Sequence, residues 1–195
     1  MIKIRLAAKA DREKYLKFAK DVFSTSEQVI DFPTLLPKIY SPECEHRAKN
    51  YIAVDEADNI VGLVAICELI LDAEGTMLKC GYIGTVSVSP EQRGKGIMRQ
   101  VMERVISDSI QEGYDLLNLD GTRQRYGYYG FAPAGERIKI TITKSNIYHC
   151  IRDIDIDGID YVKLNTENAD SKAALFLHNN RTWKIDRSDP GFSMV

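Results

Sequence analysis

The chain has 195 residues, of which 44 % are apolar and 28 % are charged, so it is long enough for one ordinary domain with a buried core. Its formal net charge is −2, from 26 basic and 28 acidic residues, and this balance argues against a nucleic-acid-binding surface. The longest apolar run, residues 60–71, contains Glu68 and is too short to span a bilayer, and the first residues contain no apolar segment of signal-peptide length. We therefore expect a cytoplasmic protein with no membrane partner.

Cysteine and histidine spacing gives no sign of a metal site. The four cysteines, at positions 44, 67, 80 and 150, are far apart and form no CxxC pair. Free thiols in a reducing compartment are the simplest interpretation. The three histidines show no HExxH or other ligand spacing, so we expect no metal.

The N-terminal part of the chain predicts a strand, a helix and an irregular segment. Residues 2–6 alternate apolar and basic side chains, as a half-buried strand does. Asp11 is the expected N-cap of a helix whose apolar face includes Tyr15 and Phe23. Residues 24–47 hold three prolines and are expected to shape a pocket or a lid.

The rest of the pattern predicts a sheet with further helices. In chain order, we expect a strand from residue 51, strands over 60–71 and 77–88, a helix over 96–112, a strand over 115–119, a short helix over 122–129 and a strand over 137–143. This order indicates an α/β (α+β) fold, with a mixed, mostly antiparallel sheet and helices on both faces. Glycines at 81 and 84 inside a strand indicate a bulge or the close approach of a ligand or backbone.

A basic, glycine-punctuated turn lies between the expected strand over 77–88 and the next helix. Arg93, Gly94, Lys95 and Gly96 come directly before that helix, where backbone N–H groups lack intrahelical partners and the helix dipole is positive. Glycines let a ligand approach this backbone closely, and the two cations add full positive charge. The pattern predicts an anion site, most naturally for a phosphate or pyrophosphate.

Two nucleotide-binding motifs do not fit this turn. A Walker A loop needs Ser or Thr after its lysine, and Lys95 is followed by Gly96. A dinucleotide fingerprint needs a third glycine where Arg99 stands. Taken alone, the turn is also compatible with a basic surface turn that opens a helix, or with a phosphate-binding domain for an unrelated ligand.

The turn resembles motif A of the Gcn5-related N-acetyltransferase (GNAT) superfamily. The family pattern Q/R-x-x-G-x-G/A is matched by residues 93–98, with Met98 in the place of the usual Gly or Ala. In that family the loop holds the pyrophosphate of acetyl-CoA, and the end of the preceding strand pairs with the pantetheine arm. The resemblance therefore implies acetyl-CoA as cosubstrate and a set of cofactor-binding residues. These are Val86, Ser87, Val88, Arg93, Gly94, Lys95, Gly96, Ile97, Met98, Gly121 and Thr122.

A second stretch, RQRYGYYGFAPAG at residues 123–135, resembles the family's later Y-x-x-x-G-F motif. The matching residues are Tyr126, Gly130 and Phe131. In many members that tyrosine protonates the leaving thiolate, so the resemblance implies Tyr126 as the general acid. A phenol within hydrogen-bond reach can supply such a proton. Without the resemblance, Tyr126 is also compatible with an aromatic packing cluster.

The stretches RGKGIMRQVM and YGYYGFAPA are most similar to the branch that contains the enhanced-intracellular-survival acetyltransferases, in which further domains follow the GNAT domain. We expect residues 1–144 to form the acetyl-CoA-binding catalytic domain. Residues 145–195 are expected to be a C-terminal extension, with a strand over 161–164 and a helix over 171–179. This extension is either a natural tail or the start of a truncated second domain.

The resemblance implies an N-acetyltransferase that moves an acetyl group from acetyl-CoA to a primary amine by direct attack in a ternary complex. The acceptor is left open between a small-molecule amine and a protein or peptide lysine, and a homo-oligomer is left open too. Only weak candidates exist for the general base: Glu27, Asp31, Glu43, His46 and Asp120. The lack of an evident base leaves an alternative, an acyl-CoA-binding regulatory module with the same fold and little or no turnover.

Overall fold

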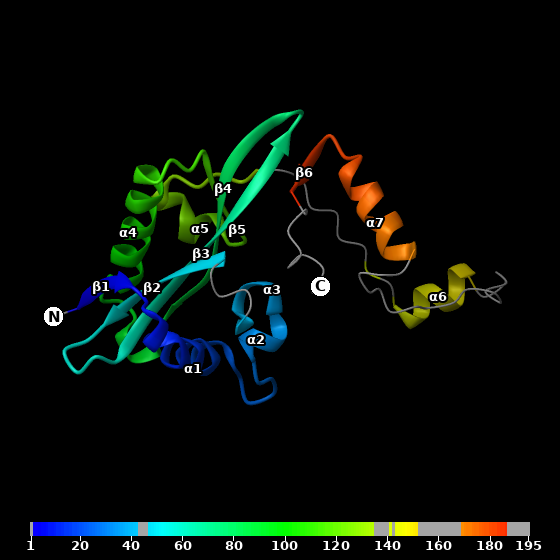
Figure 1. Ribbon diagram of the computed structural model, residues 1–195. Coiled ribbons are helices and arrows are strands. Elements are labelled where there is room, and N and C mark those ends of the chain that lie inside the picture. Colours follow the sequence, from blue (N-terminus) through cyan, green and yellow to red (C-terminus); the bar gives the residue numbers. More distant parts are fainter. Residues whose placement is uncertain (1, 43–46, 135–140, 142, 152–168, 187–195) are drawn as a thin grey trace.

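A computed structural model describes residues 2–42, 47–134, 141, 143–151 and 169–186. Within these residues a six-stranded sheet runs in the order β1-β2-β3-β4-β5, and β6 pairs with β3 (Figure 1). The strands are β1 (Lys3–Leu6), β2 (Ala48–Val54), β3 (Ile60–Ala73), β4 (Thr76–Val88), β5 (Leu116–Leu119) and β6 (Trp183–Ile185). Only the β4–β5 pair among them is parallel. The predicted mixed, mostly antiparallel sheet is confirmed.

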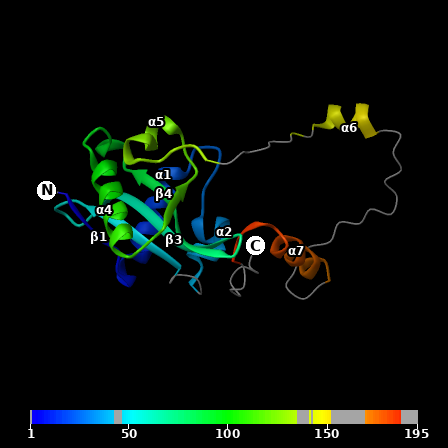
Figure 2. The same ribbon diagram turned by 90° about the horizontal axis from the view of Figure 1, so that it is seen from above.

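The described residues also contain α-helices and short 3-10 turns. They are α1 (Arg12–Phe23), α2 (Phe32–Leu35), α3 (Pro37–Tyr40), α4 (Ile97–Gln111), α5 (Arg123–Tyr126), α6 (Lys144–Ile151) and α7 (Ala169–Asn179), with 3-10 turns η1 (Lys9–Asp11), η3 (Pro90–Gln92) and η4 (Gly127–Tyr129). Searching the described residues finds no helix with the length and apolar character needed to cross a membrane. The helix α7 leads into β6 at the end of the long β3–β4 hairpin (Figures 1 and 2).

Alternating side chains of β2 divide the core between the two faces of the sheet. Tyr51 and Ala53 belong to a buried cluster with residues of α4. Ile52 and Val54 belong to a second cluster, with residues of α1, α2 and α3. Each of these four residues is at most 4 % exposed, so the sheet is covered on both faces, as the sequence predicts.

Two expectations about individual elements need correction. Asp11 is the N-cap residue of α1, as predicted, but its side chain makes no capping hydrogen bond to α1; its carboxylate instead accepts hydrogen bonds from Arg5 and from the Ala8 N–H. The segment expected to be irregular contains α2 and α3, and α2 is capped by Asp31, whose carboxylate accepts from the Thr34 N–H. A short, locally capped helix leaves little periodic signal in the sequence.

The C-terminal predictions are tested only in part. The helix expected over 171–179 is α7, which begins at Ala169. The strand expected over 137–143 falls largely outside the described residues, and the strand expected over 161–164 falls wholly outside them. The short helix expected over 122–129 is present as two pieces, α5 and η4.

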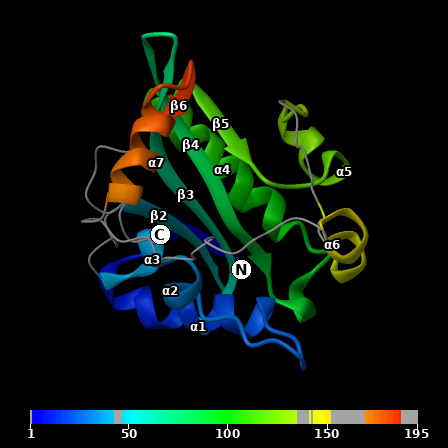
Figure 3. The ribbon, with the colours of Figure 1, turned by 90° about the vertical axis from the view of Figure 1, so that its right-hand side faces the viewer.

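Two features distinguish the C-terminal end of β4: a bulge, and the end of its pairing with β5. Leu63 pairs with Ser87 and Ala65 with Gly84, so Val64 lies opposite two β4 residues instead of one. β5 pairs with β4 only over residues 80–83 of β4, and Figure 3 shows the two strands diverging beyond that point. In the described part of the chain, the last residues of β4 therefore have a free edge on the β5 side.

Candidate acetyl-CoA site

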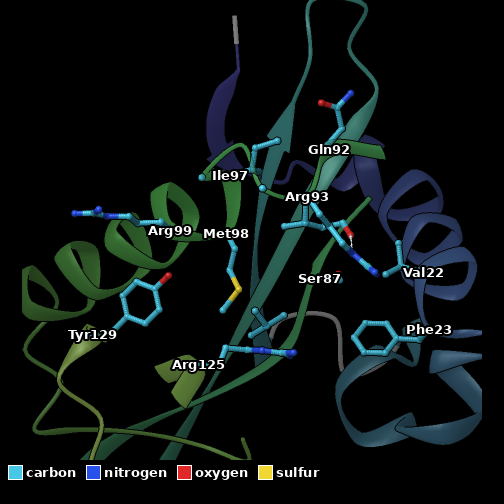
Figure 4. A pocket seen from close by; sticks show the side chains of 14 residues that line it. Val22, Phe23, Ser87, Gln92, Arg93, Ile97, Met98, Arg99, Arg125 and Tyr129 are labelled. Atoms are coloured by element: carbon cyan, nitrogen blue, oxygen red, sulfur yellow. Dashed lines mark hydrogen bonds between the residues drawn. The ribbon is translucent and has the colours of Figure 1, made fainter. Parts of the chain in front are cut away.

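A pocket of about 670 Å³ lies at the end of β4. Its walls come from the C-terminal end of α1, the last residues of β4, the N-terminus of α4, and the α5–η4 segment (Figure 4). The lining residues are Val22, Phe23, Val86, Ser87, Val88, Gln92, Arg93, Gly94, Gly96, Ile97, Met98, Arg99, Arg125 and Tyr129. Four elements far apart in the sequence thus meet around one cavity.

Two glycines give the loop before α4 its shape. Gly94 has φ +79° and Gly96, the residue before the first turn of α4, has φ +74°, a left-handed conformation that residues with a Cβ rarely adopt. The first helical bond of α4 runs from the Gln100 N–H to the Gly96 carbonyl. The amide groups of residues 97–99 therefore precede the intrahelical bonding pattern, and all three residues line the pocket.

Two arginines give the pocket positive charge. Arg93 and Arg125 extend toward the wall formed by Val22 and Phe23, whereas the Arg99 side chain points away from the cavity (Figure 4) and is held by Glu103 in an ion pair of 2.8 Å. The Arg93 Nε also donates to the Val88 carbonyl at 3.4 Å. Together with the helix N-terminus, these cations make a site for a multiply charged anion.

Most residues predicted to bind the cofactor line this pocket, and three do not. Those that do are Val86, Ser87, Val88, Arg93, Gly94, Gly96, Ile97 and Met98. Lys95 is outside the lining, and its Nζ donates to Gln92 Oε1 at 2.7 Å. Gly121 packs under the ring of Tyr126, because a Cβ there would lie 2.2 Å from a ring carbon. The Thr122 carbonyl accepts the Arg125 and Tyr126 N–H groups at the start of α5.

Two tyrosines of the α5–η4 segment differ in position. Tyr126 is 6 % exposed and packs edge-on against Phe131, with ring centroids 6.4 Å apart. No group of the described residues hydrogen-bonds its hydroxyl, and Tyr126 is not among the residues that line the pocket. Tyr129 lines the pocket itself, and burial beside the Glu103 carboxylate raises its pKa.

The candidate bases are not gathered at the pocket. Asp31 caps α2, and its hydrogen bonds from Thr34 lower the pKa of its carboxyl group. Glu27 and Asp120 are exposed, and Glu43 and His46 lie outside the described residues. The lining contains no Asp, Glu or His among the residues that the structure describes.

Sequence reasoning missed six lining residues: Val22, Phe23, Gln92, Arg99, Arg125 and Tyr129. The sequence predicts Phe23 on the apolar face of a helix, and helical spacing does not show that α1 ends beside the pocket. Phe23 is in fact 40 % exposed. Arg99 comes directly after the predicted motif at residues 93–98, and Arg125 lies within the stretch at residues 123–135, so their place beside predicted binding residues could have suggested them.

Comparison with known proteins agrees with this geometry. A family model described as "Acetyltransferase (GNAT) domain" matches residues 3–134, whereas no curated protein matches the chain. Similar solved structures include an acetyltransferase from Trypanosoma brucei (15 % identity, TM-score 0.55, 73 % of this chain and 100 % of that chain). They also include a glucosamine-6-phosphate N-acetyltransferase from Arabidopsis thaliana (17 % identity, TM-score 0.53, 73 % of this chain and 99 % of that chain). A third is a GNAT family N-acetyltransferase from Escherichia coli in complex with CoA (20 % identity, TM-score 0.57, 67 % of this chain and 68 % of that chain). At these identities the likeness shows the fold.

Proposed function

Because the chain belongs to the GNAT acetyltransferase family, we propose that it transfers an acetyl group from acetyl-CoA directly to a primary amine in a ternary complex. The observation that carries this proposal is that the N-terminus of α4, two arginines and the free edge of β4 meet in one pocket. The first two suit the phosphates of CoA, and the strand edge suits its extended amide arm.

Binding of the cosubstrate divides between two parts of the pocket. The amides of residues 97–99, with Arg93 and Arg125, receive the pyrophosphate. The free edge of β4 at Val86 and Val88 offers backbone groups that can pair with the pantetheine amides as an added strand. The phosphate part binds any ligand with a pyrophosphate, and the β4 edge favours CoA over a nucleotide without the pantetheine arm.

The chemistry requires that a neutral amine reaches the thioester carbonyl. A carbon–nitrogen bond forms, the carbon–sulfur bond breaks, the amine loses one proton and the CoA sulfur gains one. We assign the proton donated to sulfur to the Tyr126 hydroxyl. The amine proton leaves to solvent or to a base that the pocket lining does not supply, which restricts fast turnover to amines that are neutral when bound.

The acceptor is proposed as a small-molecule amine or the lysine side chain of a protein or peptide. Free cysteines at positions 67, 80 and 150 support a reducing, cytoplasmic location. The enhanced-intracellular-survival branch is proposed from the two sequence stretches alone. The catalytic domain is proposed as residues 1–144, with residues 145–195 as its extension, and the family match at residues 3–134 supports that boundary.

One observation favours a second function. The absence of Asp, Glu and His from the lining, as far as the structure describes it, suits a module that binds acyl-CoA and senses it without turnover. The two functions share their cosubstrate and differ only in whether an amine is acetylated.

The test is an acetyl-transfer assay with the purified chain. Acetyl-CoA is offered with a panel of polyamines, amino sugars, amino acids and lysine peptides, and thiol release is followed together with the mass of the amine product. We expect at least one amine to be acetylated at a rate that depends on enzyme concentration, and Arg93→Ala to raise the KM for acetyl-CoA. Tight CoA binding with no acetylated product across the panel would favour the sensing module.

A further inference from the structure

A buried tyrosine outside the pocket contacts β4, the strand whose last residues form one wall of the pocket. Tyr40, the last residue of α3, is 4 % exposed, and its hydroxyl shares a hydrogen bond with the Thr85 hydroxyl. Burial raises the pKa of Tyr40 to about 12, so the phenol stays protonated near neutral pH. It acts there as a hydrogen-bonding group and not as a base.

Thr85 has a backbone conformation that needs support. Its φ is +52°, in the left-handed region, which is unfavourable for a β-branched residue. Strained conformations persist where the surroundings hold them in place. The Thr85 carbonyl accepts the Ser87 hydroxyl at 3.1 Å, and Tyr40 holds the Thr85 side chain from the neighbouring core cluster.

This residue lies where β4 changes from a sheet strand to a pocket wall. Before it, residues 80–83 of β4 pair with β5. After it, Val86, Ser87 and Val88 line the pocket. Thr85 and Val86 are the two residues opposite Val64 in the bulge. Because a bulge re-aims the strand that follows it, the conformation of Thr85 sets the direction of the pocket edge.

An aromatic series joins Tyr40 to the opposite wall of the pocket. The ring of Tyr40 packs edge-on against Phe32 with centroids 5.5 Å apart, and Phe32 packs in the same way against Phe23 at 5.4 Å. Phe23 lines the pocket. Arg12 adds a further restraint, because its Nη2 donates to the Tyr40 carbonyl at 2.5 Å. Tyr40 is therefore linked to both the β4 wall and the α1 wall of the pocket.

We propose that Tyr40 is a positioning residue for the acyl-transfer site: through Thr85 it holds the β4 bulge, and so aligns the strand edge that receives the pantetheine arm. The inference rests on the proposed function, because it takes CoA as the ligand of the pocket. It predicts that losing the Tyr40 hydroxyl weakens recognition of the pantetheine arm while recognition of the nucleotide is unchanged.

The test is a binding comparison that needs no acceptor. CoA and adenosine 3′-phosphate 5′-diphosphate, which lacks the pantetheine arm, are titrated into the wild-type chain and three variants: Tyr40→Phe, Thr85→Val and the double variant. Tyr51→Phe is the matched control, because Tyr51 is also a buried tyrosine, 2 % exposed, but belongs to the cluster that packs against α4 and not to the cluster of Tyr40. Thermal unfolding of each variant checks the fold.

We expect Tyr40→Phe to weaken CoA binding about tenfold, the size of one lost hydrogen bond, and to change the Kd of the nucleotide by less than about twofold. Thr85→Val should lose CoA affinity to the same extent, and the double variant should lose little more than either single variant, because the two side chains are partners in one hydrogen bond. Equal losses for both ligands, an equal effect of Tyr51→Phe, or unchanged CoA binding would overturn the inference alone. Absence of CoA binding by the wild-type chain would overturn the proposed function and this inference together.

Discussion

At the scale of single residues, Tyr126 combines a buried ring with a hydroxyl that no described group bonds. We expect Tyr126→Phe to lower kcat by about 10²-fold, the lower end for losing an acid catalyst, and to leave the Kd of CoA within about twofold. Steady-state kinetics with the best amine of the panel, together with CoA titration, measures both quantities. The phenylalanine keeps the packing against Phe131 and Gly121.

Tyr129 is the control for that change, because it lines the pocket three residues further on. Tyr129→Phe should act mainly on the KM for acetyl-CoA. The opposite result, with kcat lost in Tyr129→Phe and kept in Tyr126→Phe, would assign the acid to Tyr129.

The ion pair of Asp11 with Arg5 predicts an acid-dependent loss of stability. The two groups lie 2.6 Å apart, and the Asp11 side chain is 9 % exposed; this partner lowers the pKa of Asp11 to about 2. A lowered folded-state pKa stabilises the fold above the unfolded value near 4, and the benefit disappears as pH falls from about 4 to about 2.

Asp11→Asn should therefore lower the free energy of unfolding by about 1–2 kcal/mol at pH 7, and wild type and variant should converge near pH 2. Urea denaturation across this pH range measures the difference. Asp21→Asn is the control, because Asp21 pairs with Lys17 at an exposed site on α1 and should change stability little. A constant difference at all pH values would contradict the role given to the Asp11 carboxylate.

Local backbone geometry could be predicted from the sequence where it depends on a few neighbouring residues. The glycines before α4 lie at a turn in which Gly94 and Gly96 both have a positive φ, a conformation that glycine adopts readily; their contact with a ligand stays a prediction. The bulge partner Tyr40 could not be predicted, since its contact with Thr85 joins residues 45 positions apart. Gly81 was expected near a ligand or backbone, and a Cβ there would instead lie 2.6 Å from an Ile66 side-chain carbon.

At the scale of elements, α4 is flanked by two glycines whose substitution distinguishes an effect on CoA binding from an effect on stability. Gly96 precedes the first turn with φ +74° and Gly113 follows the last with φ +73°, and in both cases a Cβ would meet nothing within 4 Å. Either glycine changed to alanine should cost about 1 kcal/mol of stability from the left-handed backbone.

Only Gly96→Ala should weaken CoA binding, by about tenfold or more, because its Cβ and altered backbone meet the pyrophosphate. Calorimetry with CoA and thermal unfolding of both variants separate the two effects. Equal CoA affinity in the two variants would contradict binding of the pyrophosphate at the N-terminus of α4.

Long, strongly periodic elements were predictable, and short ones were not. β3, β4 and α4 lie within about two residues of their predicted bounds, because runs of 13 to 15 residues give a clear apolar period. The four-residue helices α2 and α3 depend on a local cap and on prolines at their first turns. The three-residue β6 owes its place to pairing with β3, a contact that no local pattern encodes.

At the scale of the whole molecule, the pocket forms because four elements converge, and its positive charge contrasts with a net charge of −2 for the chain. We expect CoA binding to weaken as salt is raised, because exposed cations are screened. Arg125→Ala should reduce both the affinity and its salt dependence. Arg104→Ala is the control, since Arg104 lies further along α4, is paired with Asp108 at 2.8 Å and is not part of the lining. An unchanged salt dependence in Arg125→Ala would exclude that arginine from anion binding.

Whether this pocket binds acetyl-CoA is tested by calorimetric titration of the purified chain with acetyl-CoA, CoA and ATP under one set of conditions. We expect a Kd on the order of micromolar for the two CoA ligands and much weaker binding of ATP, which carries the phosphates but no pantetheine arm. ATP binding as tightly as CoA, or no binding of either CoA ligand, would contradict the assignment of this pocket to acetyl-CoA.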